Sequence, residues 1–266
     1  MPYRIDIRCG GDVDDQLDRL VELGALDVES SDATRVAALM PDSITPDDVA
    51  SALGADQIVV SPAVGRDNGS IWVLTPRSIR IGSLRIVPAG LDREPGDLTL
   101  IDSAAFGTGL HPTTAMCLEA LDEIVRTAHP ESVLDVGTGS GVIALAALML
   151  GVSRAVAIDV DPAALGAAAD NAHVNGLDAR VQLARGGPEI VTGTWPLVLA
   201  NILAAPLIAM APALIRRVGH HGQLVLSGIA SSVAPEVARA YVHQGMHQVD
   251  MKSRGGWTAL VLRASW

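Results

Sequence analysis

The chain has 266 residues, of which 49% are hydrophobic and 3% aromatic, and its formal net charge is −11. A chain of this length can hold one large domain or a large and a small one, and its apolar content excludes extended disorder. The negative charge disfavours direct binding to nucleic acid, whose phosphates it would repel. The first residues lack the apolar run of a secretory signal, so we expect a cytoplasmic protein.

Residues 1–64 predict a small α+β domain. Caps at Asp12 and Thr45 mark two helix starts, and Gly24 and Gly54 mark the corresponding ends. Strands are expected at 3–9, 25–30, 34–40 and 57–64, and helices at 12–24 and 45–54. The order strand, helix, strand, strand, helix, strand is that of a ferredoxin-like domain.

The negative charge is concentrated in this first domain. Residues 1–65 hold thirteen acidic residues and four arginines, so their net charge is −9. An acidic surface would attract a basic protein, and we expect the domain to take part in recognising one. The alternative is that the acidic side chains only solvate a small exposed domain.

Residues 65–100 predict a linker followed by connecting strands. Strand-like pieces at 71–75, 79–87 and 98–101 are interrupted by prolines and glycines. We expect this connection to pack on a second domain, which we place at 101–266.

Strands and helices alternate from residue 131 onward. Strands are expected at 132–136, 154–159, 179–184, 196–201, 222–228, 247–253 and 257–264, and helices at 141–151, 161–176, 205–218 and 232–245. Such alternation predicts a mostly parallel sheet covered on both faces. Only Arg-Gly-Gly separates the last two strands, so they must pair as an antiparallel hairpin.

One apolar run, residues 196–215, is about as long as a helix that crosses a bilayer. It contains Asn201 and three prolines, which disfavour one continuous helix. A buried strand followed by a loop and a helix explains the run better. We therefore predict no membrane partner.

The stretch "LDVGTGSG" at 134–141 runs from a predicted strand into a predicted helix. Gly137 and Gly139 allow a tight turn and a close approach of a ligand to the backbone, and Gly141 allows close helix packing. This spacing is one residue tighter than the dinucleotide fingerprint. Asp135 would disfavour a pyrophosphate and favour a cationic ligand.

A second acidic residue, Asp159, ends the next strand, twenty-two positions after Gly137. A carboxylate at this place can accept both hydroxyl groups of a ribose. The chain has no Gly-Lys-Ser/Thr sequence, which excludes a phosphate-binding P-loop. A ligand with a ribose, a positive charge and no phosphate is S-adenosylmethionine.

The segments "VLDVGTGSG", "AIDVDP" and "ADNAHVNG" resemble the first motifs of class I methyltransferases. The segments "AFGTGLHPTT" and "LANILAAPL" are similar to the PrmA family of ribosomal protein methyltransferases. The resemblance implies a Rossmann-like class I methyltransferase sheet and S-adenosyl-L-methionine as methyl donor. It also implies methylation of lysine or N-terminal amines in a basic, large-subunit ribosomal protein that the acidic first domain would dock.

The resemblance also implies roles for single residues. The residues that fall on the family's cofactor-binding positions are Thr114, Gly137, Asp159 and Asn201. Phe106 and Gly107 of a neighbouring loop, and Asp135 and Gly139 of the bend, complete the predicted cofactor-binding set. Phe106, the only phenylalanine of the chain, would belong with Gly107 and His111 to a loop that closes over the cofactor. The alternatives are that Phe106 is an ordinary core residue and that His111 only stabilises its loop.

Methyl transfer is an in-line displacement that needs alignment of the reacting atoms and exclusion of water. An amine reacts in its neutral form, and a polar acceptor can orient it. Asn201 follows a predicted strand, and we expect its side chain to contact the cofactor and to orient the amine. The alternative is an Asn201 that caps the next helix.

Several other functions remain open at this level. The substrate could be a different protein, such as the β-subunit of an electron-transfer flavoprotein, or a small molecule. A nicotinamide-dependent oxidoreductase is a further alternative, although the final hairpin and Asp135 disfavour it. The seven histidines and two cysteines show no metal-ligand spacing, so no metal site is predicted.

Overall fold

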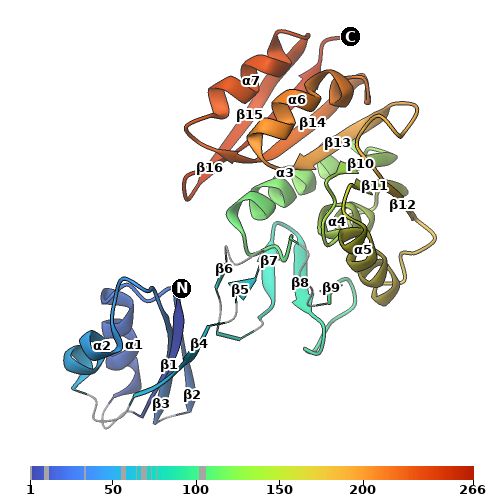
Figure 1. Ribbon diagram of the computed structural model, residues 1–266. Coiled ribbons are helices and arrows are strands. Elements are labelled where there is room, and N and C mark those ends of the chain that lie inside the picture. Colours follow the sequence, from blue (N-terminus) through green and yellow to red (C-terminus); the bar gives the residue numbers. More distant parts are fainter. Residues whose placement is uncertain are drawn as a thin grey trace. The chain divides into compact units, whose positions relative to one another are not determined.

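The chain forms two compact units, Met1–Pro76 and Arg77–Trp266 (Figure 1). The segment predicted as a connection, 65–100, is therefore divided between the two units. The computed structural model describes residues 2–8, 12–32, 34–54, 58–63, 65–66, 71–72, 74–75, 77–101 and 106–266.

The first unit packs two helices on one antiparallel sheet. Its elements are β1 (Tyr3–Arg8), α1 (Val13–Glu22), β2 (Asp27–Asp32), β3 (Arg35–Met40), α2 (Pro46–Leu53), β4 (Ile58–Pro62), and the short strands β5 (Gly65–Arg66) and β6 (Ile71–Trp72). The strand order is β2-β3-β1-β4, with β1 antiparallel to both of its neighbours. The helices cover a core that includes Ile5, Ile7, Leu20 and Met40. This is the strand order of a ferredoxin-like domain.

The helix ends in this unit follow from local chemistry. Thr45 and Asp48 form a capping box, in which each side chain accepts a hydrogen bond from the other residue's backbone N–H. Asp12 caps α1 by accepting from the N–H of Asp14. Gly54 ends α2 in the left-handed conformation, with a φ angle of 60°.

The second unit is built on a seven-stranded sheet. Its strands are β10 (Ser132–Val136), β11 (Arg154–Asp159), β12 (Val181–Arg185), β13 (Trp195–Asn201), β14 (Val218–Ala230), β15 (Met246–Arg254) and β16 (Trp257–Ala264). Their order is β12-β11-β10-β13-β14-β16-β15. β10 to β14 pair in parallel, whereas β16 is antiparallel to both β14 and β15. The predicted parallel sheet with an antiparallel final hairpin is confirmed.

Five helices cover the two faces of this sheet. They are α3 (Pro112–Ala128), α4 (Val142–Met149), α5 (Pro162–Val174), α6 (Ala204–Ile215) and α7 (Ala234–Val242). Side chains of α3, α4 and α5 share one buried cluster, and those of α6 and α7 share another. In the second cluster the hydroxyl of the fully buried Tyr241 donates to the carbonyl of Leu207 at 2.7 Å.

The long helix α3 is absent from the elements that we predicted. It begins with Pro112 at its first position, and His111 is its N-cap through an Nδ1 atom that accepts from the N–H of Thr113. Pro at this position is a usual signal, but histidine is not among the usual N-cap residues. Residue-type preferences therefore predict a loop at this position.

Only part of the predicted connection packs on the second unit, because β6, which lies within the predicted piece 71–75, belongs to the first unit. β7 (Ile79–Ile81), β8 (Leu84–Pro88) and β9 (Leu98–Leu100) form a small sheet whose apolar side chains join the core beside α3. The apolar run 196–215 forms β13 and then α6. Within the described residues, no helix has the length and hydropathy needed to traverse a bilayer.

Candidate active site

The glycine-rich bend between β10 and α4 is held by close contacts that leave no room for side chains. Gly137 has a φ angle of 74°, and a Cβ atom there would collide with the side chain of Ile202. Gly139 has a φ angle of 55°, and a Cβ atom there would lie 2.5 Å from the carbonyl oxygen of Phe106. Both positions therefore require glycine for conformation and for space.

Asp159 ends β11 beside this bend. One of its oxygens accepts from the N–H of Gly139 at 3.0 Å, and the other accepts from the N–H of Asp161 at 3.0 Å. A carboxylate offers about four acceptor positions, so about two remain for a ligand. The structure thus joins the predicted carboxylate to the predicted bend.

Asp135 lies fully buried under the bend. The hydroxyl of Thr138 donates to one carboxylate oxygen at 2.7 Å, and the other oxygen has no hydrogen-bond partner among the described residues. Burial raises the pKa of Asp135 to about 7; the hydrogen bond from Thr138 and the backbone N–H of Ala144 oppose this rise, and the Asp159 carboxylate adds to it. Without a ligand, Asp135 is therefore only partly ionised at neutral pH.

This raised pKa predicts a pH-dependent stability. The pKa of an unfolded aspartate is about 3.9, so between about pH 4 and pH 7 the folded chain binds the proton more tightly than the unfolded chain. The free energy of unfolding should therefore fall as pH rises, by up to about 1.4 kcal/mol per pH unit. Asp135→Asn cannot titrate and should lack this contribution. Urea unfolding of both proteins across this range measures the difference, and a difference independent of pH would contradict the prediction.

The segment that holds Phe106 and Gly107 is bound to the glycine-rich bend. The N–H of Ser140 donates to the Phe106 carbonyl at 2.9 Å, and the Ser140 hydroxyl donates to the Gly107 carbonyl at 2.6 Å. Residues 102–105, which precede Phe106, lie outside the described residues. Phe106 is half-buried, so it is not an ordinary core residue.

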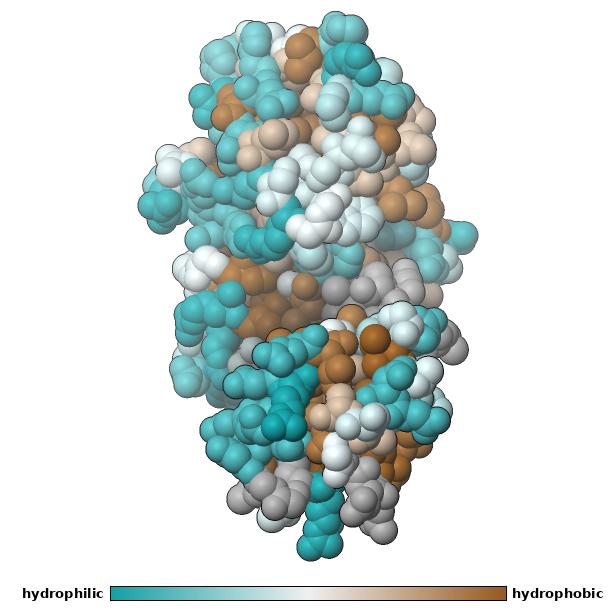
Figure 2. Space-filling view, turned by 90° about the vertical axis from the view of Figure 1, so that its left-hand side faces the viewer, coloured by the Kyte–Doolittle hydropathy of each residue, from teal (hydrophilic) through white to brown (hydrophobic). Residues whose placement is uncertain are grey.

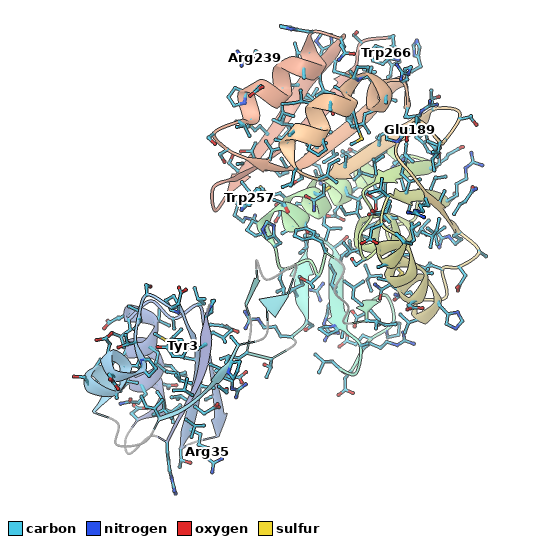
Figure 3. All side chains as sticks on the ribbon, in the orientation of Figure 1. Tyr3, Arg35, Glu189, Arg239, Trp257 and Trp266 are labelled. Atoms are coloured by element: carbon cyan, nitrogen blue, oxygen red, sulfur yellow. The ribbon has the colours of Figure 1, made fainter. Side chains whose placement is uncertain are left out.

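His111 connects this segment to the end of the chain. Its ring packs edge-on against Phe106 and against Trp257, with ring centroids 5.2 Å apart in each pair. Figure 3 shows Trp257 at the start of β16, near the beginning of α3. His111 is buried and caps α3, which fits a loop-stabilising role.

Asn201 ends β13 and is paired with Thr114 of α3. The Asn201 amide nitrogen donates to the Thr114 hydroxyl at 3.1 Å. The amide oxygen is buried and has no hydrogen-bond partner in the described part of the chain. Asn201 does not cap α6, because the N-cap residue of that helix is Leu203. An unpartnered buried acceptor is costly, which favours a ligand or substrate that donates to it.

The eight predicted site residues therefore lie in one region of the second unit. The hydrogen bonds above join Phe106, Gly107, Asp135, Gly139 and Asp159 to the bend or to its neighbours. Gly137 contacts Ile202, the residue after Asn201, and so links the bend to the Asn201–Thr114 pair. This is the edge where the parallel strands end, which is the usual ligand-binding edge of such sheets. Their individual contacts with a cofactor stay predictions.

Three supporting residues carried no predicted role. The side chain of the buried Asn171 donates to the Ser140 carbonyl at 2.8 Å and accepts from the N–H of Ile101 at 2.7 Å. Ser140 binds the Phe106 segment, and Trp257 packs on His111. Asn171 lies in the quoted motif "ADNAHVNG", which is a signal that could have found it. No motif in the sequence around Trp257 indicates that this residue packs on His111.

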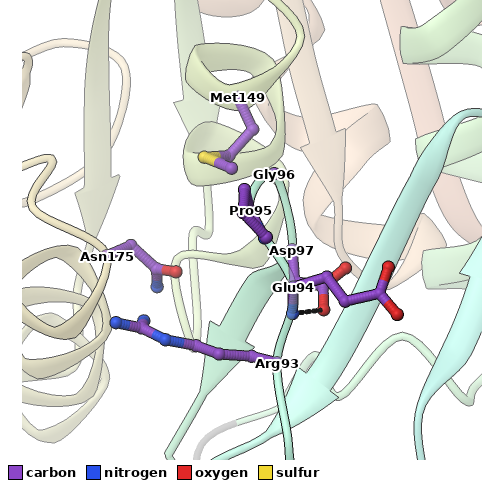
Figure 4. Close-up of a pocket in the computed structure, with 7 residues that line it drawn as sticks. All are labelled: Arg93, Glu94, Pro95, Gly96, Asp97, Met149 and Asn175. Carbon is purple, nitrogen blue, oxygen red and sulfur yellow. Dashed lines mark hydrogen bonds between the residues drawn. The ribbon is translucent and has the colours of Figure 1, made fainter.

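A separate cavity of about 390 Å³ is lined by Arg93, Glu94, Pro95, Gly96, Asp97, Met149 and Asn175 (Figure 4). The Glu94 N–H donates to Asp97 at its rim. None of the eight predicted site residues lines this cavity, but the side chain of its lining residue Asn175 donates to the Asn171 carbonyl at 2.7 Å, and Asn171 in turn binds Ser140 of the bend. Among the residues the structure describes, no group of three or more metal-ligating side chains occurs.

Comparisons with known proteins place the chain in a family. The family model of ribosomal protein L11 methyltransferase (PrmA) matches residues 70–265. A ribosomal protein L11 methyltransferase of Pelobacter propionicus is 38% identical over 213 residues, which are 77% of this chain and 69% of that protein. One of Geobacter sulfurreducens is 42% identical over 172 residues, which are 64% of this chain and 56% of that protein.

A solved structure agrees with these sequence matches. The ribosomal protein L11 methylase of Lactobacillus delbrueckii subsp. bulgaricus superposes with a TM-score of 0.64 at 31% identity, covering 70% of this chain and 98% of that one. The likeness supports the predicted class I methyltransferase fold of the second unit. The chain belongs to the ribosomal protein L11 methyltransferase (PrmA) family.

Proposed function

We propose that this chain transfers methyl groups from S-adenosylmethionine to amino groups of a ribosomal protein of the L11 kind, in the cytoplasm. The observation that carries the proposal is the joint placement of the glycine-rich bend, the Asp159 carboxylate and the unpartnered oxygen of Asn201 at one sheet edge. The family to which the chain belongs supports the same activity.

The residues at this edge fit the proposed cofactor. The places where Gly137 and Gly139 would carry a Cβ atom are filled by the Ile202 side chain and the Phe106 carbonyl, so the fit to the cofactor rests on the two carboxylates beside the bend. Asp159 keeps free acceptor positions for ribose hydroxyls, and the unpartnered oxygen of Asp135 suits a cationic ligand. When bound, S-adenosylmethionine supplies a methyl group on a positively charged sulfur.

Asn201 would orient the incoming amine. Its amide nitrogen is held by Thr114, so its oxygen is the atom left to accept a hydrogen bond. When the amine donates one N–H to this oxygen, the lone pair of its nitrogen is left free to point toward the methyl carbon of the donor. The contribution of the chain is then alignment and exclusion of water, which this reaction requires.

The first unit suits a basic protein as partner. The acidic residues of α1 and α2 that lie on the surface are Asp14, Asp15, Asp18, Glu22, Asp47 and Asp48. Hydrophobic residues interrupt the otherwise hydrophilic surface in the lower part of Figure 2. In this unit, Val59 and Val60 of β4 are hydrophobic side chains that are 64% and 49% exposed. Acidic and apolar groups together can bind a basic protein through charge and burial.

A labelling experiment tests the proposal. The full chain is incubated with methyl-labelled S-adenosylmethionine and unmethylated large-subunit ribosomal proteins, and we expect label on the L11 protein in amine-linked form. Label on another protein, or only on small amines, would replace the substrate assignment. Binding of a nicotinamide dinucleotide without binding of S-adenosylmethionine would replace the reaction class.

A further inference from the structure

Exposed apolar side chains lie one or two positions after two of the proposed ligand-binding residues. Val160 follows Asp159 and is 69% exposed, and Leu203 lies two positions after Asn201 and is 65% exposed. Within the described residues, these are the two highest values among the large hydrophobic side chains. Single exposed apolar residues are common, but each of these two lies just after a strand whose end carries a proposed site residue.

Leu203 also occupies a position that favours a different residue type. It is the N-cap of α6, and its side chain makes no capping hydrogen bond. Serine, threonine, aspartate and asparagine stabilise this position, whereas leucine does not. The residue is therefore poor for both solvation and helix capping, and such local conflicts are typical of functional sites.

The backbone before Leu203 is tightly held. The N–H of Ile202 donates to the Ser227 carbonyl at 3.2 Å, and the Ile202 side chain contacts Gly137. The Ile202 carbonyl lies so close to Gly228 that a Cβ atom there would collide with it. Leu203 thus points outward from a tightly held backbone, two positions after Asn201.

We propose that Leu203 is a specificity-determining residue of the proposed reaction, and that its side chain packs against the aliphatic stem of the substrate lysine. The inference rests on the proposed function. The proposal places the amine at the Asn201 oxygen and its carbon chain along the end of β13, where Leu203 is the exposed side chain two positions further on. The four-carbon stem of lysine is apolar and packs well on an aliphatic side chain.

The test is a graded substitution series, Leu203→Met, Leu203→Ala and Leu203→Ser, with recombinant unmethylated ribosomal protein L11 as acceptor. We expect kcat/KM to be retained in Leu203→Met and to fall about tenfold in Leu203→Ser, with Leu203→Ala between them. The loss should lie mainly in KM for the acceptor. The affinity for S-adenosylmethionine, measured by calorimetry, should not change, and Tm should not fall in Leu203→Ser because serine caps α6.

Leu91→Ser is the matched control, because Leu91 is another exposed leucine, at 44%, and lies outside the proposed site. It should leave kcat/KM unchanged. An unchanged kcat/KM across the Leu203 series, or a fall accompanied by lower Tm and weaker S-adenosylmethionine binding, would overturn the inference alone. A wild-type chain that binds S-adenosylmethionine but does not methylate the acceptor would overturn the proposed function and this inference with it.

Discussion

Asn201→Ala is expected to lower kcat about a hundredfold at saturating S-adenosylmethionine, because an amine that is no longer oriented loses its alignment with the donor carbon. Within the described residues, the Asn201 oxygen, like one oxygen of Asp135, is a buried acceptor without a hydrogen-bond partner at this edge of the sheet. Its loss should affect kcat more than the KM for the acceptor protein, since most of the protein–protein contact is made elsewhere. Steady-state kinetics with the L11 acceptor measures both.

Thr114→Val provides the graded control for this result. Valine keeps the shape of the buried Thr114 side chain but removes the hydroxyl that holds the Asn201 amide. We expect a smaller fall in kcat, up to about tenfold, since one hydrogen bond contributes about 0.5–1.5 kcal/mol. A kcat that is unchanged in Asn201→Ala would remove this residue from the reaction and leave it a purely structural role.

Asp159→Ala is expected to weaken S-adenosylmethionine binding by about 1–3 kcal/mol, through lost hydrogen bonds to the ribose. That range corresponds to an increase of roughly five- to 150-fold in Kd. The substitution also removes the acceptor of the Gly139 N–H, so the bend itself loses a restraint. Titration calorimetry measures the affinity directly, without any acceptor protein.

Asp161→Ala is the matched carboxylate control, two residues further on. Asp161 caps α5 by accepting from the N–H of Ala163 at 2.8 Å, and its own N–H still reaches Asp159 after the substitution. It should cost about 1 kcal/mol of stability and leave the affinity for the cofactor unchanged. Equal affinities in the wild type and in Asp159→Ala would place Asp159 outside the binding site.

Much of the second unit could be predicted because its signals are local. Strands of about five residues alternate with apolar helices, and this alternation alone predicts parallel pairing with helices on both faces. The short Arg-Gly-Gly link forces an antiparallel hairpin for the same kind of local reason. Helix α3 was missed because its N-cap is His111, whose capping role depends on a ring orientation that no residue-type preference predicts.

The candidate site divides in the same way. The bend at Gly137 and Gly139 is visible in the sequence, because positive φ angles and close contacts demand glycine. The exposure of Leu203, in contrast, results from how Ile202 is held between Gly137 and the end of β14. A leucine in an apolar run predicts burial, so the sequence pattern points the wrong way here.

The amino-acid sequence by itself determined the order of strands and helices from residue 131 onward, the strand and helix order of the first unit, the tight bend and the acidic residue at the next strand end. Each of these depends on neighbours within a few residues, or on the rule that parallel strands end at one edge of a sheet. The tertiary structure alone decided which distant residues meet there. Asn201 donates a hydrogen bond to Thr114, 87 positions away in the sequence, and Trp257 of the final hairpin packs against His111. Such pairs form only when the sheet brings its strand ends and α3 together. Short-range sequence patterns therefore cannot predict them.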